Sequence, residues 1–354
     1  MDIASLYDLA RAGDLVSFQL AMPDLGVAAA EGGPETLGEL AGLFDLVPAA
    51  MAGHLAIIAG ALVENGAPPG PVVAPIARGL LEVLTAASGF AGTWRAMVGG
   101  KERPPNPGGA QDAYDGSIAR LTRGRRLPRR AGLPHDRAVE YANGWFPLEE
   151  WATAATSVLT DRAARAAFPR RDEALRLVRE LSQVRGDLGR LEDVLAVLDD
   201  EQLLVVDRAE GRAWTVRIGG IAENFQLYTM LADAFGRDVD PAWLAASTTG
   251  PAGKAGRIEA RVQLSDAHGR YIAVEGRPAD IPVVEDRRVV VLDPPPYGRS
   301  WDLGRAHDRM VPWLEVAEAH DGVPVTVAPA ERIPGHRPAN IHFGRLAGTV
   351  EVTG

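Results

Sequence analysis

The chain contains no cysteine among its 354 residues. This absence excludes disulfide bridges, thiolate nucleophiles, zinc sites with cysteine ligands and iron–sulfur clusters. It does not identify the redox compartment, because a chain without cysteine is compatible with oxidising and reducing surroundings alike. Candidate chemistry is therefore limited to the remaining polar side chains, such as imidazole, carboxylate, hydroxyl and guanidinium groups.

The first residues lack the basic segment and the apolar run of a secretory signal. Asp2 and Asp8 stand in the opening stretch MDIASLYDLARAGD, which predicts a cytoplasmic protein. Long hydrophobic runs are also scarce. The longest candidate, residues 46–63, is uncharged, but it is rich in alanine and glycine and is flanked by Asp45 and Glu64. These features predict a buried core helix and no membrane span.

Positive charge is in deficit: 37 basic residues face 47 acidic ones, which gives a net charge of −10. Because phosphate backbones bind to positive surfaces, this balance argues against general nucleic-acid binding. One segment is locally basic, in contrast to the rest of the chain. Its arginines form a candidate interaction surface: Arg123, Arg125, Arg126, Arg129 and Arg130. We expect them to pair with acidic residues of this chain or of a protein partner. Nucleic acid is the alternative, although the segment lacks aromatic residues that stack on bases.

The length exceeds the size at which one hydrophobic core usually stops growing, so two domains are expected. Up to residue 199, apolar residues recur at spacings of three and four, which is typical of helices; from residue 200 they alternate, which is typical of strands. The prediction is an α+β protein. A bundle-like helical domain covers residues 1–199, with an exposed linker and the arginine segment at about 99–137, and an α+β domain covers residues 200–354.

Helices are expected in the first domain over residues 35–65, 71–98 and 147–168, separated by proline and glycine. A more regular pattern follows, from about residue 171 to 200. Its apolar residues are Leu177, Leu181, Val184, Leu188, Leu191, Leu195 and Leu198. Their 3.5-residue repeat predicts one long helix with an apolar seam. The seam fits either a dimerising coiled coil or a bundle helix packed inside the same chain.

The second domain shows short alternating runs. The expected strands are 201–208, 213–218, 260–266, 270–276, 287–293, 312–319, 324–329 and 348–354. One amphipathic helix, residues 221–235, interrupts them and carries Phe225, Tyr228 and Leu231 on one face. The connections are too short for a doubly wound parallel sheet. The prediction is therefore a mostly antiparallel sheet with this helix packed on it.

Common catalytic motifs are missing. The stretch 248–257 lacks the glycine spacing of a phosphate loop, and Ala255 stands where a magnesium-binding hydroxyl is needed. No serine lies in a G-x-S-x-G turn. We therefore predict no cofactor and no metal. An alternative metal site would use His336 and His342, whose neutral imidazoles suit zinc or iron, but no histidine pair has the short helical spacing that makes such a site specific.

The stretch VVVLDPPPYGRSWD leads from an expected strand into an acid, three prolines and an aromatic ring. The five residues DPPPY resemble the D-P-P-Y loop of amino-group methyltransferases, and this resemblance implies an enzyme that uses S-adenosylmethionine. The third proline displaces Tyr297 by one position, however, and no glycine-rich loop accompanies the motif. By themselves the prolines predict a rigid, extended corner, because each fixes φ and donates no backbone hydrogen bond.

Polar and aromatic residues of the last third form a candidate pocket. They are Glu275, Asp280, Asp293, Tyr297, Arg299, Trp301 and His307. If this segment folds back on itself, Arg299 orients a carboxylate or phosphate while Tyr297 and Trp301 line the pocket. The structural alternative is an arginine that pairs internally and two rings that cover a sheet edge.

Two functions are compatible with these features. The first is a soluble intracellular interaction or assembly protein that binds a protein partner or itself. The heptad helix, the arginine segment and the proline-stiffened loops offer surfaces for it, and no complete set of catalytic groups is present. The alternative is an enzyme that acts on a small polar or anionic molecule through the candidate pocket of the second domain.

Overall fold

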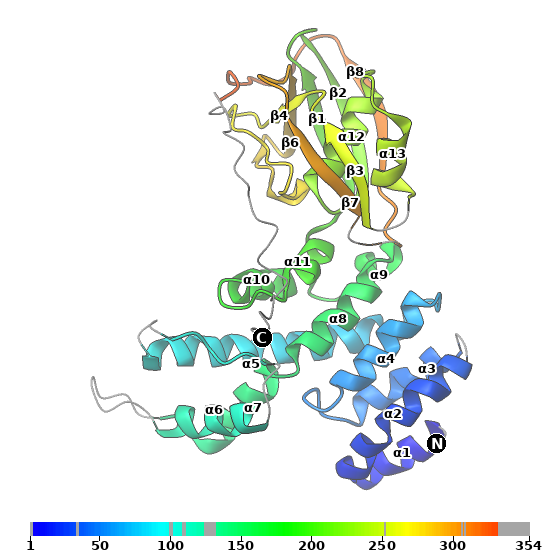
Figure 1. Ribbon diagram of the computed structural model, residues 1–354, viewed down its shortest axis with the longest axis vertical. Helices are drawn as coiled ribbons and strands as arrows, with labels where there is room; N and C mark the ends of the chain where they lie inside the picture. Colours follow the sequence, from blue (N-terminus) through cyan, green and yellow to red (C-terminus); the bar gives the residue numbers. More distant parts are fainter. Residues whose placement is uncertain are drawn as a thin grey trace, which may run out of the picture.

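A computed structural model describes residues 3–32, 35–98, 102–107, 111–123, 132–250, 253–305, 307 and 309–331. It confirms the α+β class, with a helical region and a mixed six-stranded sheet. Figure 1 shows the helical region, here called the helical half, below the sheet, here called the sheet half. The helices α9, α10 and α11 lie where the two halves meet.

The helical half is built from short and medium helices around one long helix. Its elements are α1 Ile3–Ala12, α2 Leu15–Gly32, α3 Thr36–Ala41, η1 Gly42–Asp45, α4 Gly53–Glu64, α5 Gly70–Val98, α6 Gln111–Arg123, α7 His135–Trp145, α8 Leu148–Leu159, α9 Arg162–Ala167, α10 Arg171–Leu181 and α11 Gly189–Ala196. The helix expected at 71–98 is confirmed as α5. The other two expected helices are each divided by a turn, one after η1 and one at Asp161.

Helix α5 forms the centre of the helical core. It packs against α7, α8 and α10, and its Phe90 ring stacks on Trp145 of α7 with 5.0 Å between ring centres. Small residues permit close contact. A Cβ on Gly144 would lie only 2.7 Å from the Val83 carbonyl oxygen of α5. Burial of this apolar and aromatic surface is the main source of stability for the helical half.

Among the described residues, α5 is also the one helix long and apolar enough to cross a membrane, and 61% of its most apolar 18-residue window is buried. The core helix of a soluble protein passes the same test of length and composition. The apolar stretch at 46–63 contributes a loop and most of α4, whose leucines and alanines include Leu55, Ala56, Ala59 and Leu62, all buried in the same core.

The single long helix expected from residue 171 to 200 is wrong. Helix α10 ends at Leu181, and α11 begins only at Gly189. In the turn between them, the buried Arg185 pairs with Asp187 and donates a hydrogen bond of 2.6 Å to the carbonyl of Trp145. The buried leucines of the expected seam are Leu177, Leu181, Leu188, Leu191 and Leu195. Their repeat therefore reflects packing inside this chain.

The sheet has the strand order β4-β6-β1-β2-β8, and β5 pairs with β6 beside it. Its strands are β1 Leu198–Asp207, β2 Arg212–Ile221, β4 Gln263–Ser265, β5 Val283–Val284, β6 Arg287–Asp293 and β8 Trp313–His320. Neighbouring strands are antiparallel except β1 and β6, which are parallel. The sheet is thus mostly antiparallel, as predicted. A separate two-stranded ribbon joins β3 Gly253–Glu259 to β7 Ser300–Arg305.

Alternation along β1 divides the core of the sheet half between two faces. Leu203 and Val205 face a layer that includes α12 Asn224–Ala234. The helix expected at 221–235 is thus confirmed except at its start, because Ile221 is the last residue of β2. Leu204 and Val206 face the opposite side. A further helix, α13 Pro241–Thr248, packs against α12 and the β3–β7 ribbon (Figure 1). The central strands therefore bury both of their faces, and more apolar residues pack on the face that α12 covers.

Not every expected strand is present. The runs at 270–276 and 324–329 contain no extended strand; Tyr271 makes only an isolated bridge to Ser265. The second run begins and ends at proline, which cannot donate to a strand ladder, and its Val325 and Val327 pack instead on the less covered face of the sheet. The run at 348–354 lies outside the described residues.

Candidate functional site

Three residues of the sequence-based candidate pocket meet in one aromatic neighbourhood. The Arg299 guanidinium lies 4.6 Å from the ring centre of Tyr271 and 5.8 Å from that of Tyr297. Trp301 of β7 meets Tyr228 of α12 edge to face, with 4.9 Å between ring centres. Burial raises the pKa of Tyr271, and the charge of Arg299 opposes this rise. Arg299 is thus held by aromatic faces through cation–π contacts.

Of the remaining candidates of that pocket, Glu275 influences Tyr271, whereas Asp293 makes its contacts elsewhere. The Asp293 carboxylate, at the end of β6, accepts hydrogen bonds from Arg208 Nε at 2.6 Å and from Ser265 Oγ at 3.0 Å. Glu275 is exposed, and its charge contributes to the raised pKa of Tyr271. The contacts of the described residues therefore do not join Asp293 to the aromatic neighbourhood as one catalytic set.

Two further candidates lie near other parts of the chain. The buried His307 accepts a hydrogen bond of 3.2 Å at its carbonyl oxygen from Arg305 Nη2. Asp280 pairs with Arg179, which belongs to the helical half. The pocket expected over residues 275–307 is thus spread over several environments within the described structure.

The arginine surface and the histidine pair are mostly beyond the described residues. Arg123 is exposed at the end of α6. The residues without a structural description are Arg125, Arg126, Arg129, Arg130, His336 and His342. In the part of the chain that is described, no group of three or more histidine, aspartate or glutamate side chains is arranged to hold a metal ion.

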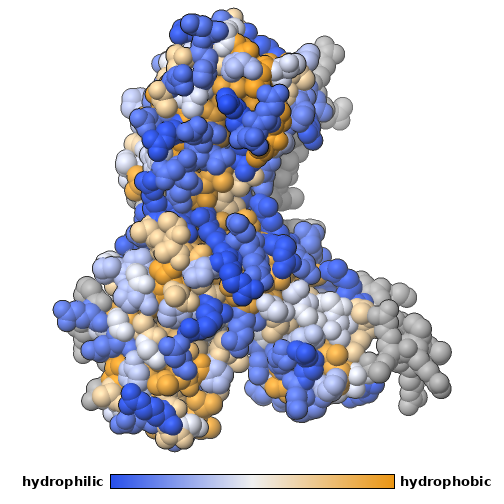
Figure 2. All heavy atoms as spheres, turned by 180° about the vertical axis from the view of Figure 1, so that it is seen from behind, coloured by the Kyte–Doolittle hydropathy of each residue, from blue (hydrophilic) through white to orange (hydrophobic). Residues whose placement is uncertain are grey.

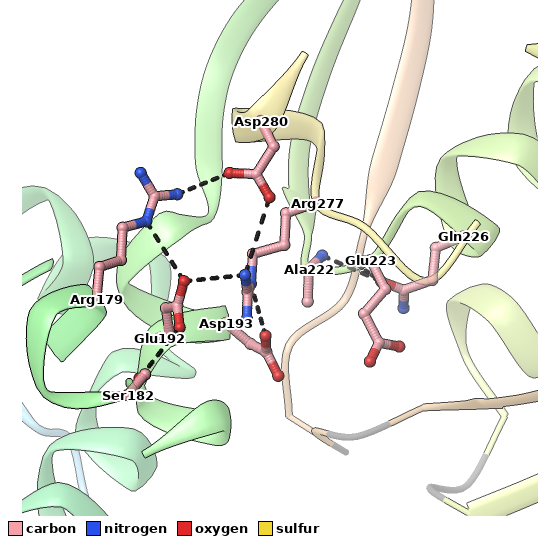
Figure 3. Close-up of polar contacts among 9 residues, drawn as sticks. All are labelled: Arg179, Ser182, Glu192, Asp193, Ala222, Glu223, Gln226, Arg277 and Asp280. Atoms are coloured by element: carbon pink, nitrogen blue, oxygen red, sulfur yellow. Dashed lines mark hydrogen bonds and ion pairs between the residues drawn. The ribbon is translucent and has the colours of Figure 1, made fainter. Parts of the chain in front are cut away.

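A network of arginines and carboxylates joins the two halves (Figure 3). Arg277 of the sheet half donates hydrogen bonds to Asp193 at 2.8 Å and to Glu192 at 3.0 Å, both on α11. Arg179 of α10 donates to Glu192 at 3.3 Å and to Asp280 at 2.8 Å. Burial raises the pKa of Asp193, while the hydrogen bond and charge of Arg277 oppose the rise. The network fixes α10 and α11 against the base of the sheet half.

Glu223 stands beside this network without an ion pair to another described residue. Burial raises its pKa to about 7; the Asp193 carboxylate adds to the rise and Arg277 opposes it. Its backbone N–H and that of Ala222 donate to Gln226 Oε1, which fixes the start of α12 (Figure 3). A folded-state pKa of this kind makes the stability of the protein depend on pH.

A large hollow lies elsewhere, in the helical half. This α5–α7 groove has a volume of about 790 Å³, with α5 as its floor, α7 as one wall and the loop before α4 as the other. Figure 2 shows the hollow between two lobes of the helical half, one with α1 to α4 and one with α6 and α7. Its apolar lining includes Pro48, Ala74, Leu81, Ala86, Val139 and Pro169.

Five charged residues line the groove, and their pairing is unequal. Arg78 pairs with Asp45, Arg170 with Glu173 and Glu140 with Arg137. In contrast, Glu82 of α5 and Asp136 of α7 make no hydrogen bond or ion pair through their side chains to any described residue.

Both carboxylates are exposed, Glu82 on the α5 floor and Asp136 on the α7 wall, whereas the other charged lining residues are paired. The groove therefore combines an apolar floor with a net negative rim, which favours a cationic ligand.

A second hollow of about 460 Å³ adjoins the groove and shares Pro48, Arg78 and Glu82 with it. Along α5 the groove extends from Ala74 to Ala86, which is about 18 Å at 1.5 Å per residue. This length corresponds to about three turns of a ligand helix. The shape is therefore elongated, unlike the compact pocket of a small substrate.

The groove was not predicted from the sequence. Its walls come from segments more than sixty residues apart, and each contributes ordinary helix residues. One signal was present: Glu82 interrupts the apolar pattern of α5 between Leu81 and Val83, which are both buried. A carboxylate of this kind marks the solvent side of a core helix, but not what lies opposite.

Comparisons with protein-family models, with curated proteins and with solved structures gave no significant match.

Proposed function

We propose that this protein is an interaction protein whose α5–α7 groove receives a basic amphipathic helix of a partner protein. The observation that supports this function is the groove itself: an apolar floor about three turns of helix long, beside two carboxylates that the described chain leaves unneutralised. Grooves that bind amphipathic helices combine these elements, with apolar anchors at helical spacing and charged residues at the rim.

The two carboxylates indicate that the partner segment is positively charged. A ligand helix that buries leucine or alanine on the floor can place lysine or arginine beside Glu82 of α5 and Asp136 of α7. The overall charge of −10 adds a long-range attraction for a cationic segment. Salt screens charges on the surface, so binding should weaken as ionic strength rises.

The test uses a synthetic peptide of about 14 residues, helical, with leucines on one face and lysines on the other, labelled for fluorescence anisotropy. We expect saturable binding to the full chain. The double variant Glu82→Gln with Asp136→Asn should bind about tenfold more weakly, because two favourable charge contacts are lost. Thr85→Trp, at an exposed position of the lining, should abolish binding by filling the groove.

The matched control removes two exposed carboxylates outside the groove, with Glu39→Gln and Asp112→Asn. It changes the net charge equally and should leave the affinity within about twofold. A peptide with glutamate in place of lysine should not bind. Equal binding by the groove variants and the control, or no binding by the wild type, would refute the proposed function.

A further inference from the structure

The parallel strands β1 and β6 carry the same pattern, four apolar residues followed by an aspartate. β1 ends in Leu-Leu-Val-Val-Asp207 and β6 in Val-Val-Val-Leu-Asp293. Because Asp207 pairs with Leu292 in the register, the two aspartates lie at the same edge of the sheet. They are 1% and 8% exposed. Carboxyl ends of parallel strands are a common place for ligands in α/β sheets, and burial of two acids there requires a reason.

Both carboxylates are already supplied with donors. Asp207 Oδ1 accepts from the backbone N–H groups of Ala209 and Glu210, at 3.0 and 3.1 Å, and Oδ2 accepts from Arg237. Asp293 accepts from Arg208 and Ser265, as described above. The aspartates therefore hold arginines and a loop in place. Because their oxygens already accept these hydrogen bonds, the two aspartates do not favour a bound cation.

A cavity of about 140 Å³ lies beside them and is lined by Asp207, Arg237, Arg261, Asp293, Pro294 and Pro295, among others. The prolines are the first two of the DPPP corner. They supply a rigid wall without N–H donors, so hydrogen bonds to a ligand have to come from the arginines.

The two arginines have unused donor capacity. Arg237 makes its hydrogen bond to Asp207, but its Nε is buried without a partner among the described residues. Arg261 also has a buried Nε without a partner in the described part of the chain. Its guanidinium lies 5.5 Å from the ring centre of Trp243, and the carboxylate that it approaches there is that of Glu259, at 3.8 Å. A guanidinium carries five N–H donors, and a buried donor without an acceptor is costly. Both Nε atoms are shielded from the cavity, so the donors available to a ligand are the Nη groups of Arg261, which donate no hydrogen bond to a described residue.

The charges beside the cavity also favour an anionic ligand. Arg237 balances Asp207 and Arg208 balances Asp293, which leaves Arg261 as the additional charge beside the cavity. Its nearest carboxylate, on Glu259, is two-thirds exposed and therefore well screened. The cavity volume equals that of about five liquid waters. This is sufficient for one tetrahedral oxyanion.

We propose that this cavity is a binding site for a phosphate group, held by the guanidinium groups of Arg237 and Arg261. Planar guanidinium forks match the oxygen geometry of phosphate. The site is separate from the α5–α7 groove, and the proposal does not depend on the function of that groove.

Isothermal titration calorimetry of the full chain with inorganic phosphate tests the proposal, against sodium chloride at matched ionic strength. We expect one saturable site for phosphate and none for chloride. Arg261→Met should weaken phosphate binding at least about tenfold, and Arg261→Lys should fall between, because lysine keeps the charge but loses the fork. Acetate should bind more weakly than phosphate; if it binds more tightly, the site is one for carboxylates and the phosphate proposal is wrong.

Arg287→Met is the matched control, because Arg287 is exposed on β6 and does not line the cavity. It removes the same charge and should leave the affinity for phosphate within about twofold. Arg261 is one-third exposed and makes no short ion pair, so its variants should fold, which their circular dichroism and unfolding midpoints verify. Absence of phosphate binding by the wild type, or equal affinities of Arg261→Met and Arg287→Met, would overturn the proposal.

Discussion

Arg165 of α9 holds Asp199 of β1 in a two-pronged ion pair, with Nε to Oδ2 at 2.7 Å and Nη2 to Oδ1 at 2.8 Å. The remaining nitrogen, Nη1, donates to the carbonyls of Leu159 and Thr160 at 2.9 and 3.0 Å. Arg165 is 3% exposed. A buried guanidinium with this many partners fixes the point where the chain passes from the helical half into the sheet.

Replacement of Arg165 by methionine should therefore be strongly destabilising. It leaves the Asp199 carboxylate, whose side chain is 12% exposed, without its partner. We expect a loss of about 3–5 kcal/mol in the free energy of unfolding, measured by urea denaturation. The double variant Arg165→Met with Asp199→Asn should recover part of this loss, because no unpaired charge remains.

The neighbouring pair of Arg162 and Asp200 supplies a control. It joins the same helix and strand, but its side chains are 55% and 44% exposed. Arg162→Met should cost less than about 1 kcal/mol, as is usual for exposed ion pairs. Similar losses for Arg162→Met and Arg165→Met would contradict the role assigned to the buried pair.

Glu223 predicts a second effect, on the pH dependence of stability. Its pKa is near 4.5 in the unfolded chain and about 7 in the folded one. Between these values the folded protein keeps a proton that the unfolded chain has lost, so the free energy of unfolding falls as pH rises from about 4.5 to 7. The decrease from this group is up to about 3 kcal/mol, from 1.36 kcal/mol per unit of pKa.

Glu223→Gln should remove this decrease, because glutamine resembles the protonated acid at every pH. Urea denaturation at pH 5 and pH 8 measures it as the difference between the wild type and the variant. We expect the variant to be the more stable protein at pH 8 and nearly equal to the wild type at pH 5. A wild-type slope that persists in Glu223→Gln would assign the pH dependence to other groups.

The leucine repeat gives a third prediction. Since Leu195 is buried in the core of its own chain, Leu195→Ala should cost about 2–5 kcal/mol in stability without a change of oligomeric state. Leu20→Ala, at a leucine that is 78% exposed, should change stability by less than about 0.5 kcal/mol. Light scattering checks the mass. A dimer that becomes monomeric with Leu195→Ala would restore the coiled-coil hypothesis.

Sequence periodicity predicted the class of the fold better than its connections. The strand signal at 287–293 and the helix signals at 71–98 and 221–235 were sufficient, because each segment buries one continuous apolar pattern. The repeat over 171–200 misled because α10 and α11 both contribute leucines to one core, and a repeat does not reveal the turn between them. The glycines at 186 and 189 were the available sign of that turn.

The candidate sites were harder to predict from the sequence than the fold class. Asp293 was identified as a candidate from the DPPP corner, but the pattern in β1 that ends at Asp207 went unused, since only the parallel register brings the two acids to one edge. Arg237 and Arg261 come from loops far apart in sequence, and nothing local indicates that both face the same cavity. Contacts between residues of separate loops form only in the tertiary structure, and no local sequence pattern predicts them one by one.

A last prediction joins packing to the proposed function. Gly144 of α7 lines the α5–α7 groove and lies against α5, where an added Cβ would come within 2.4 Å of Ala86 Cβ and 2.8 Å of the Ala87 backbone nitrogen. Backbone cannot yield as a flexible side chain does, so α7 must move away from α5. We expect Gly144→Ala to lower the free energy of unfolding by about 1–3 kcal/mol and to weaken binding of the basic peptide.

Gly116 of α6 is the matched control, because it is exposed and nothing lies within 4 Å of the position of its Cβ. Gly116→Ala should raise stability by about 0.5–1 kcal/mol through helix propensity alone and leave peptide affinity unchanged. The two variants make the same chemical change, so opposite signs of their effects isolate the close contact of α7 with α5. If Gly144→Ala destabilises the fold but binds the peptide like the wild type, the groove does not depend on that contact as the proposed function requires.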